Sequence, residues 1–294
     1  MRRSRSAARI LHLAYRAPYD FAALLAFFAR RVIPGVESVD EDSYTRHFAL
    51  GDRACQLRVT QRKGAKALTL ALEGVPAAHA EAVKVRVRRM FDVDADIAAI
   101  NRHFRADARL RPCVRRHPGQ RLPGGWDGFE IAIRAVLGQQ VSVAAARTLA
   151  QRLVENHGDR MRTRTGEEIR VFPSPQALAD ADLTRIGLPR TRAAALNAMA
   201  RAVSDARVVF AREQPLDDFV ASLSELPGIG AWTAQYIALR GMSYPDAFLT
   251  GDLVLCKAVS RDGTPVSPRE LGAMAEAWRP WRGYAVFHLW RSMG

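Results

Sequence analysis

The hydrophobic residues of this chain change their spacing once, near Asp92, and that change limits the folds open to it. Before this point they alternate with polar residues, as in Cys55, Leu57 and Val59, which is typical of a strand with one buried face. After it they recur at helical spacing and the strand pattern nearly disappears. The sequence therefore predicts an α+β fold, with an N-terminal antiparallel sheet and helices followed by a mostly helical core.

The first part is predicted to be an N-terminal antiparallel α+β domain over residues 12–91. A helix is expected from Tyr19 to Arg31, strands between about Val36 and Glu73, and a second helix from Ala77 to Met90 that covers the sheet. Residues 1–11 begin with many arginines, and the apolar stretch that follows is too short for a secretion signal. We therefore expect a disordered basic leader there.

The second part, residues 92–294, is predicted to be all helical. Ser142 and the Ser174-Pro175 pair are helix-start signals, because serine caps a helix and proline suits its first position. The segment from Arg109 to Gly125, rich in arginine, proline and glycine, is the best candidate for a linker. The predicted helices after this linker cover residues 126–138, 142–156, a segment from 174, 190–206, 216–224, 231–240 and 268–278.

Charge is the least ordinary property of the composition. Lysine and arginine total 44 against 30 aspartates and glutamates, a formal net charge of +14. A strongly basic domain attracts nucleic acid phosphates, although general solubility or a GC-rich genome that favours arginine gives the same balance of charges. The longest apolar run, Phe21 to Ala29, is far shorter than the roughly 18 residues of a membrane span. The scattered cysteines Cys55, Cys113 and Cys256 indicate neither a zinc or iron–sulfur site nor a disulfide framework.

The most informative motif lies between two helical patterns and reads Leu-Pro-Gly-Ile-Gly at residues 226–230. Pro227 ends the first helix, and Gly228 and Gly230 allow a tight turn with positive φ. Such a turn exposes backbone amides at a helix N-terminus, where they bind a phosphate oxygen without reading a base. Helical hairpins without a binding role use the same residues, but the full motif in a chain of this charge predicts contacts with DNA. The residues predicted to make these contacts are Leu226, Pro227, Gly228, Ile229, Gly230 and Thr233.

Further strings follow the hairpin in a recognisable order. The turn Tyr244-Pro245-Asp246 precedes a segment that brings Asp252 to the start of a helical run, 20 residues after Trp232. Other strings that carry the resemblance are Ala17-Pro18-Tyr19-Asp20, Arg121 to Gly124, Ala135 to Val143 and Trp278 to Ala285. Along nearly its whole length the chain resembles the helix-hairpin-helix DNA glycosylase superfamily, and within it the AlkA-type DNA-3-methyladenine glycosylase II family. The resemblance implies an active cleft between two helical subdomains.

The resemblance also implies that Asp252 is the catalytic aspartate. Hydrolysis of an N-glycosidic bond builds positive charge on the sugar, which a nearby carboxylate stabilises while it orients the attacking water. An alkylated purine such as 3-methyladenine is itself positively charged and leaves readily. From its position after Gly251 alone, however, Asp252 is equally well explained as a helix N-cap.

The base pocket implied by the resemblance contains mainly aromatic residues. A cationic base gains free energy by stacking on electron-rich rings once it has left the duplex. An alternative is simple packing, because Trp232 and Tyr236 are four residues apart on a helix and large aromatics are usually buried. The residues assigned to the pocket are Trp232, Tyr236, Trp290, Phe27 and Gln139.

Three positions define how this chain differs from its relatives. Gln140 stands where the best-known AlkA-type enzyme inserts a leucine wedge into the duplex, and Arg291 stands where that enzyme has an aromatic pocket residue. Lyase members carry a lysine directly before the Thr-Ala that follows the hairpin, and this chain has Trp232 there. Because no lysine amine is available to attack C1′, we expect hydrolysis by water that leaves an abasic site.

The resulting hypothesis is a monofunctional DNA glycosylase of base excision repair that flips alkylated bases out of duplex DNA. A non-catalytic helix-hairpin-helix DNA-binding protein is the alternative, and a bifunctional glycosylase/lyase is a weaker one. We expect no organic cofactor and no metal cluster, although hairpins of this family often hold a monovalent cation through backbone carbonyls. The expected partner is double-stranded DNA with alkylated bases, and the expected state is a cytoplasmic, nucleoid-associated monomer without membrane contact.

Overall fold

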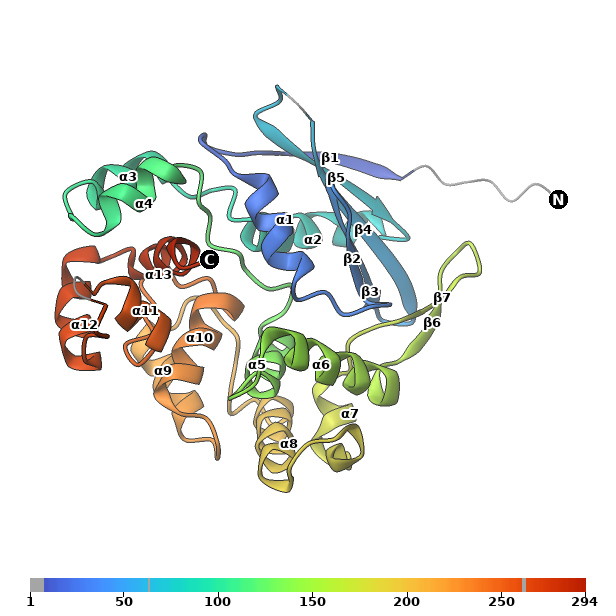
Figure 1. The fold of residues 1–294 in the computed structure, drawn as a ribbon. Helices are drawn as coiled ribbons and strands as arrows, with labels where there is room; N and C mark the ends of the chain where they lie inside the picture. The colour runs from blue at the N-terminus through green and yellow to red at the C-terminus, as the bar shows by residue number, and fades with distance from the viewer. Residues whose placement is uncertain (1–7, 63, 261–262) are drawn as a thin grey trace.

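The N-terminal part of the computed structural model is an antiparallel sheet whose buried face is covered by two helices (Figure 1). The structure describes residues 8–62, 64–260 and 263–294. Within them the sheet contains five strands in the order β1-β5-β4-β3-β2. These elements are β1 (Arg9–Ala14), β2 (Glu37–Val39), β3 (Ser43–Leu50), β4 (Arg53–Gln61), β5 (Ala67–Glu73), α1 (Phe21–Ala29) and α2 (Ala77–Met90).

The alternating pattern predicted the buried face of this sheet correctly. Leu57 and Val59 on β4 lie opposite Leu72 and Leu70 on β5, and all four side chains are buried. They pack with the apolar sides of α1 and α2 into one hydrophobic cluster. The first helix is confirmed as well, and it begins where the Asp20 carboxylate accepts a hydrogen bond from the backbone N–H of the first turn.

The prediction of a disordered leader is wrong for Arg9 to Leu11, because these residues form the first half of β1. This strand pairs with β5 at the edge of the sheet, and Leu13 is its one fully buried residue. A short edge strand with one buried side chain gives little alternation, so its pairing partner decides its structure. Residues 1–7 of the predicted leader lie outside the described residues.

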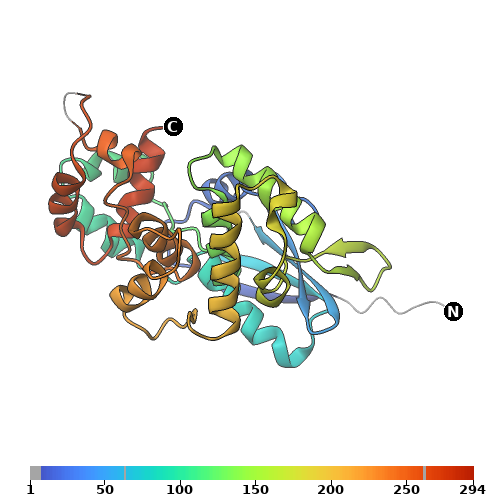
Figure 2. The ribbon, with the colours of Figure 1, turned by 90° about the horizontal axis from the view of Figure 1, so that it is seen from below.

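The later described residues form a helical core in two groups that share one hydrophobic cluster (Figures 1 and 2). In the described part of the chain no helix is long and apolar enough to cross a membrane. The first group contains α5 (Gly128–Leu137), α6 (Val143–His157), α7 (Pro175–Ala179), the 3₁₀ helix η1 (Leu183–Ile186) and α8 (Arg190–Ser204). The second contains α3 (Ile97–Phe104), α4 (Leu110–Arg116), α9 (Leu216–Ser224), α10 (Ala231–Gly241), α11 (Leu253–Ala258), α12 (Pro268–Ala275), the 3₁₀ helix η2 (Glu276–Trp278) and α13 (Arg282–Ser292).

Local signals placed most of these helices. The hydroxyls of Ser142 and Ser174 accept hydrogen bonds from the first turns of α6 and α7, and Pro175 occupies the first helical position. The predicted helix at residues 216–224 has the bounds of α9, and the helix predicted at 231–240 is α10. The hairpin and the residues that follow it therefore lie where the sequence predicts them.

Two predictions about the second part are wrong. The segment from Arg109 to Gly125 is not a loose linker, because it contains α4 and because the buried Arg121 guanidinium donates to four backbone carbonyls of the sheet domain and its junction. Nor is this part all helical, since β6 (Arg160–Arg162) and β7 (Glu168–Arg170) form an antiparallel hairpin that extends outward beyond α6 (Figures 1 and 2). Three-residue strands are too short for alternation to show in the sequence.

Candidate active site

Asp252 is the N-cap of α11, and it also lies on the wall of a cavity. Its Oδ1 accepts a hydrogen bond from the backbone N–H of Leu255 at 3.0 Å and from the indole N–H of Trp290 at 3.2 Å. Its Oδ2 lies 3.3 Å from the indole nitrogen of Trp232. The residue is buried, with 9% of its surface exposed, and it lines the cavity while it caps the helix. Three N–H donors hold the carboxylate in one orientation.

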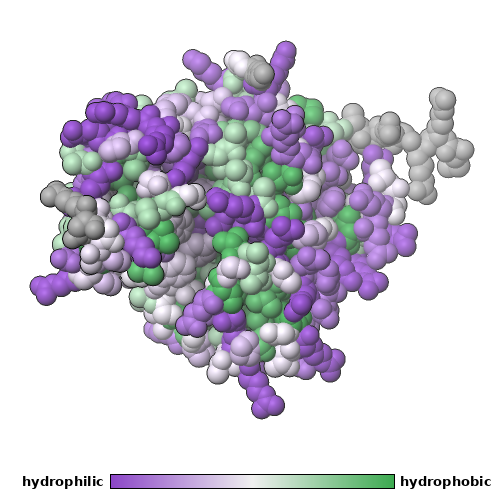
Figure 3. Space-filling view, viewed as in Figure 1, coloured by the Kyte–Doolittle hydropathy of each residue, from purple (hydrophilic) through white to green (hydrophobic). Residues whose placement is uncertain are grey.

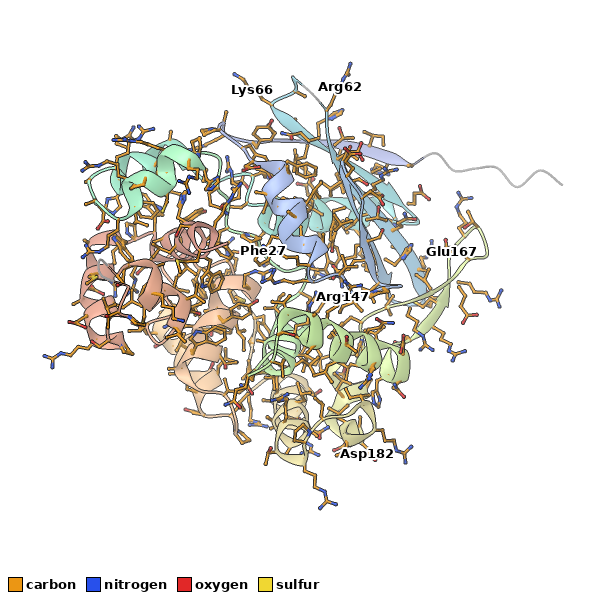
Figure 4. All side chains as sticks on the ribbon, viewed as in Figure 1. Phe27, Arg62, Lys66, Arg147, Glu167 and Asp182 are labelled. Atoms are coloured by element: carbon orange, nitrogen blue, oxygen red, sulfur yellow. The ribbon has the colours of Figure 1, made fainter. Side chains whose placement is uncertain are left out.

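The cavity has a volume of about 1140 Å³ and lies between the sheet domain and both helical groups. Five residues assigned to the site in the sequence line it: Asp252, Trp232, Tyr236, Trp290 and Phe27. Phe27 comes from α1, and Figure 4 shows it on the part of that helix nearest the helical core. On this side of the molecule hydrophobic surface lies among hydrophilic side chains near the centre of the face (Figure 3). The cavity therefore collects residues from distant parts of the chain.

Two of the aromatic residues form a platform. The rings of Trp232 and Tyr236 are nearly parallel, with centroids 5.3 Å apart and an interplanar angle of 10°. Trp290 meets Phe287 edge to face at 5.3 Å. Flat aromatic faces beside a fixed carboxylate can hold a planar ligand and stabilise positive charge that develops next to it. No group of three or more potential metal-ligating side chains occurs in the described segments.

Phe27 lines the cavity with its ring against two cations, whereas Gln139 is not among the residues that line it. The guanidinium carbons of Arg31 and Arg240 lie 3.8 and 4.5 Å from the centroid of the Phe27 ring, so its face is already in contact with cations. The Gln139 amide does not line the cavity but donates to the Gly228 carbonyl at 2.9 Å. A glutamine in this loop finds partners on the hairpin beside it, which the sequence alone does not show.

The hairpin is held by its apolar residues and leaves its backbone exposed. Leu226 and Ile229 are buried in the helical core, as is Thr233, so these side chains are not free to meet DNA. Gly228 has φ +78°, and a side chain there would lie 2.9 Å from the Cβ of Ala195. Gly230 is in an extended conformation rather than at positive φ, and it caps α10 without a side-chain hydrogen bond. Exposed amides therefore remain at the start of α10.

A network of buried charges borders the cavity, and sequence reasoning missed it. Glu37 from β2 and Glu130 from α5 bind two guanidiniums, Arg46 and Arg134. Arg134 also donates to the backbone carbonyl of Arg31. With two carboxylates and two guanidiniums the network is neutral, and it joins the sheet domain to the helix that precedes the Gln139–Gln140 loop.

Arg31 and Arg240 border the same cavity, and a sequence signal for them exists. Each lies four residues after an aromatic residue assigned to the pocket. Arg240 shares the face of α10 that carries Tyr236, whereas Arg31 lies two residues beyond Ala29, where α1 ends. Burial alone raises the pKa of Tyr236, but the guanidiniums of Arg240 and Arg31 outweigh it and lower that pKa. Arg291, the other substituted position, lines the cavity with its charge paired to Asp20 at 2.8 Å.

Two family models match consecutive parts of the chain. Residues 10–127 match the AlkA N-terminal domain, and residues 133–283 match the HhH-GPD superfamily base excision DNA repair protein. The chain belongs to the HhH-GPD superfamily of base excision DNA repair proteins. The first of these matches continues past the predicted domain boundary at Asp92, through α3 and α4.

Known proteins related to this HhH-GPD chain include one from Mycobacterium tuberculosis described as a probable bifunctional transcriptional activator/DNA repair enzyme AlkA, 37% identical over 290 residues. That match covers 96% of this chain and 57% of the relative, so the chain spans little more than half of that protein. The Escherichia coli DNA-3-methyladenine glycosylase 2 is 34% identical over 286 residues, covering 96% of this chain and 97% of the relative.

Solved structures show the same fold. A 3-methyladenine DNA glycosylase from Archaeoglobus fulgidus superposes with a TM-score of 0.82 at 22% identity, over 95% of this chain and 96% of that one. An 8-oxoguanine glycosylase/lyase from Clostridium acetobutylicum, in complex with double-stranded DNA, gives a TM-score of 0.72 at 18% identity, over 97% and 94% of the two chains. The HhH-GPD chain therefore shares its architecture with glycosylases of differing chemistry, and its own site residues must indicate which chemistry it performs.

Proposed function

We propose that this protein is a monofunctional DNA glycosylase that hydrolyses the N-glycosidic bond of alkylated bases in duplex DNA. The observation that carries the proposal is the position of Asp252, whose two carboxylate oxygens each contact the indole N–H of a tryptophan that lines the same cavity, Trp232 and Trp290. As the bond to the base breaks, positive charge grows on C1′, and a carboxylate fixed nearby stabilises it. The name of the Escherichia coli relative supports 3-methyladenine as the substrate type.

Water completes the proposed reaction. Its oxygen bonds to C1′ as the base departs with the bonding electrons, one water proton passes to solvent, and an abasic site remains. The position that carries an attacking lysine in lyase members is Trp232 here, and its indole is engaged with Asp252. We therefore propose that no covalent enzyme–DNA intermediate forms, so that borohydride traps no adduct.

DNA engagement is proposed to use two neighbouring surfaces. Amides at the N-terminus of α10 bind a phosphate of the strand, since the apolar side chains of the hairpin are buried and leave the backbone to make the contact. Gln140 is exposed with φ 56° on the loop between Gly138 and Val141, two residues that line the cavity. We propose that it fills the gap left by the flipped nucleotide. Monomeric state, nucleoid association and a monovalent cation on the hairpin carbonyls remain predictions.

The decisive experiment is Asp252→Asn. Asparagine caps a helix about as well as aspartate, so α11 keeps its start while the negative charge at the cavity is lost. We expect release of 3-methyladenine from methylated duplex DNA to fall by roughly a hundredfold or more. Binding to a duplex with a stable abasic-site analogue is expected to remain within a few-fold of the original protein.

Asp180→Asn is the matched control, because Asp180 lies at the end of α7 with its side chain 85% exposed and does not line the cavity. This variant is expected to keep full turnover. Equal turnover by the Asp252→Asn variant would rule out the proposed role of the carboxylate. Absence of base release even from the unmodified protein, together with salt-dependent binding to duplex DNA, would favour the alternative of a non-catalytic DNA-binding protein.

A further inference from the structure

The loop that carries Gln140 is tied to the hairpin by the residue before it. The side-chain nitrogen of Gln139 donates to the Gly228 carbonyl at 2.9 Å and to the Thr233 hydroxyl at 3.1 Å. Gly228 lies in the hairpin turn, and Thr233 lies in the first turn of α10. A primary amide has two N–H donors, so Gln139 directs both of them to the hairpin and the helix that follows it.

The main chain of Gln139 is held as well. Its carbonyl accepts a hydrogen bond at 3.0 Å from the guanidinium of Arg192, near the start of α8. Its backbone N–H donates at 3.2 Å to the carbonyl of Val136, in the last turn of α5. Contacts from α5, α8 and the hairpin thus converge on one residue, and they fix the peptide unit that joins it to Gln140.

Gln140 contrasts with its neighbour. Its side chain is exposed and forms no hydrogen bond within the part of the chain that the structure describes. Its φ of 56° lies in the left-handed region, which a residue other than glycine keeps only where the surrounding structure holds it. The contacts of Gln139 supply that support. The loop therefore presents a free side chain on a fixed main chain.

The distance between this loop and the hairpin matters for DNA. The amides at the start of α10 are proposed to bind a phosphate, and Gln140 is proposed to enter the gap left by the flipped nucleotide. Both contacts are made to one duplex, so the wedge meets the base stack only if it lies correctly relative to the bound phosphate. Such geometry is kept to about half an ångström by hydrogen bonds from supporting residues.

We propose that Gln139 is a positioning residue: its hydrogen bonds to Gly228 and Thr233 hold Gln140 at the place, relative to the phosphate-binding hairpin, from which it enters the duplex. Gln139 acts through Gln140 and touches neither the flipped base nor the reacting atoms. This inference rests on the proposed glycosylase function and on the proposed insertion of Gln140. It implies that loss of the Gln139 amide impairs extrusion of the base and spares the hydrolysis that follows.

The test variant is Gln139→Met, which keeps an unbranched side chain of similar length and removes both N–H donors. Gln151→Met is the matched control. Gln151 is also half-buried, its amide donates at 2.8 Å to Glu155 on the same helix, and it does not line the cavity. Each protein is compared with the unmodified one.

Two substrates carry the same alkylated base, ethenoadenine. In the first it lies opposite thymine in a continuous duplex, and in the second it is a single-nucleotide bulge with no base opposite. When the bulged nucleotide leaves the helix, the flanking pairs can stack on each other, so no gap remains for a wedge. Release rates are measured with enzyme in excess, so that they report the steps from bound DNA to free base.

We expect Gln139→Met to release ethenoadenine from the continuous duplex about tenfold more slowly, because two hydrogen bonds that hold the loop are lost. Its rate on the bulge is expected to equal that of the unmodified protein. Gln151→Met is expected to keep both rates. Equal slowing of Gln139→Met on the two substrates would indicate a general structural defect and overturn the inference, as would no slowing on either.

A double-variant cycle tests whether Gln139 acts through Gln140. Gln140→Ala alone is expected to slow release from the continuous duplex by about tenfold or more, and adding Gln139→Met is expected to cause no further loss. Additive losses would show that the two residues act independently and would overturn the inference. Unchanged release by Gln140→Ala would also overturn it, while leaving the glycosylase function itself intact.

If the unmodified protein releases no base, the proposed function fails, and a duplex with 2-aminopurine at the target position tests the inference separately. The fluorescence of this base rises when it leaves the stack. A rise on binding that Gln151→Met keeps and Gln139→Met loses supports the inference, whereas equal rises, or none with the unmodified protein, overturn it. Should Gln139→Met not fold, Arg192→Met removes the hydrogen bond to the Gln139 carbonyl and replaces it in every comparison, with the same outcomes expected.

Discussion

Two carboxylates, Glu37 and Asp92, lie where the sheet domain meets the helical core, and their surroundings differ. Glu37 accepts hydrogen bonds from two guanidiniums, Arg134 at 2.9 Å and Arg46 at 3.3 Å, and from the Tyr44 hydroxyl at 2.6 Å. Burial by itself raises the pKa of Glu37, but the two guanidiniums outweigh it and lower that pKa. At this junction the protein buries a charge together with its counterions.

Asp92 has neutral partners instead. It accepts from the backbone N–H of Leu122 at 3.0 Å and from the Tyr284 hydroxyl at 3.0 Å. The nearby Arg121 donates its N–H groups to backbone carbonyls, including that of Asp92, rather than to the carboxylate. Burial therefore dominates and raises the pKa of Asp92 to about 7.

The difference shows that burial alone does not decide the charge of a carboxylate in this protein. A guanidinium in direct contact with the carboxylate oxygens reverses the effect of burial on the pKa, whereas a guanidinium that donates to backbone carbonyls does not. Glu37 thus stabilises the junction as an anion, and Asp92 stabilises it best as a neutral acid.

The largest expected effect is at Glu37. In Glu37→Gln the buried guanidiniums of Arg46 and Arg134 lose one of their two carboxylates, and an amide donor faces the groups that donated to Glu37. We expect the free energy of unfolding to fall by about 3–5 kcal/mol, seen as a lower urea midpoint at neutral pH.

Glu168→Gln is the control for this change. Glu168 on β7 is 53% exposed and lies 3.8 Å from Arg160 and Arg162, so its loss is expected to have little effect on the midpoint. Equal midpoints for both variants would show that the buried network contributes no more than a surface pair, and the contrast between Glu37 and Asp92 would fail.

The second effect depends on pH and concerns Asp92. Its pKa of about 7 in the folded protein is above the value of about 3.9 expected when unfolded, so the folded state binds more protons between these values. Its contribution is fully present below about pH 4 and is lost as the pH rises through about 7. Asp92→Asn removes this dependence, and asparagine tolerates the positive φ of 51° found at this position.

We expect the free energy of unfolding of Asp92→Asn, relative to that of the original protein, to rise by roughly 2–4 kcal/mol between about pH 5 and pH 8. The urea midpoint of the variant should rise relative to that of the original protein over the same range. Measuring both proteins across this range isolates the contribution of Asp92, because other titrating groups are common to the two. Parallel profiles would mean that the carboxylate stays ionised throughout, and the contrast with Glu37 would disappear.

The fold was predictable to the extent that its signals are local. The helix at residues 216–224 and the caps at Ser142 and Ser174 follow from spacing and side-chain chemistry within one turn. Strand β1 and the short hairpin of β6 and β7 were missed because pairing across the fold, rather than their own pattern, defines them. The same reason explains why the proline- and glycine-rich linker candidate proved to be a buried junction around Arg121.

The candidate site, like the fold, has parts that local sequence signals predict and parts that only packing across the fold defines. Asp252 and Trp232 could be placed because the hairpin and the downstream acid form one ordered motif, and Trp290 was placed only by the family resemblance. The charges around the cavity could not be predicted, because an arginine on a helix is usually exposed. No spacing rule shows which of the 44 basic residues lacks a carboxylate partner. Arg31 follows the end of α1 and Arg240 lies on α10, and only the packing of both against the ring of Phe27 brings them together.

The smallest expected effect concerns the hydrogen bond that Tyr284 donates to Asp92, which lowers the pKa of Asp92 against the larger effect of burial. Burial and the neighbouring Asp92 raise the pKa of Tyr284, so its hydroxyl stays protonated and donates to the carboxylate. Tyr284→Phe removes this donor, and we expect a loss of about 1–2 kcal/mol at about pH 8, where Asp92 is ionised, and less at about pH 5. Tyr244→Phe is the control, because its hydroxyl donates to the Gln214 carbonyl at 2.6 Å and the loss should not change with pH. A pH-independent loss in Tyr284→Phe would show that Asp92 does not titrate in this range, since a hydrogen bond to a group that changes charge cannot keep a constant strength.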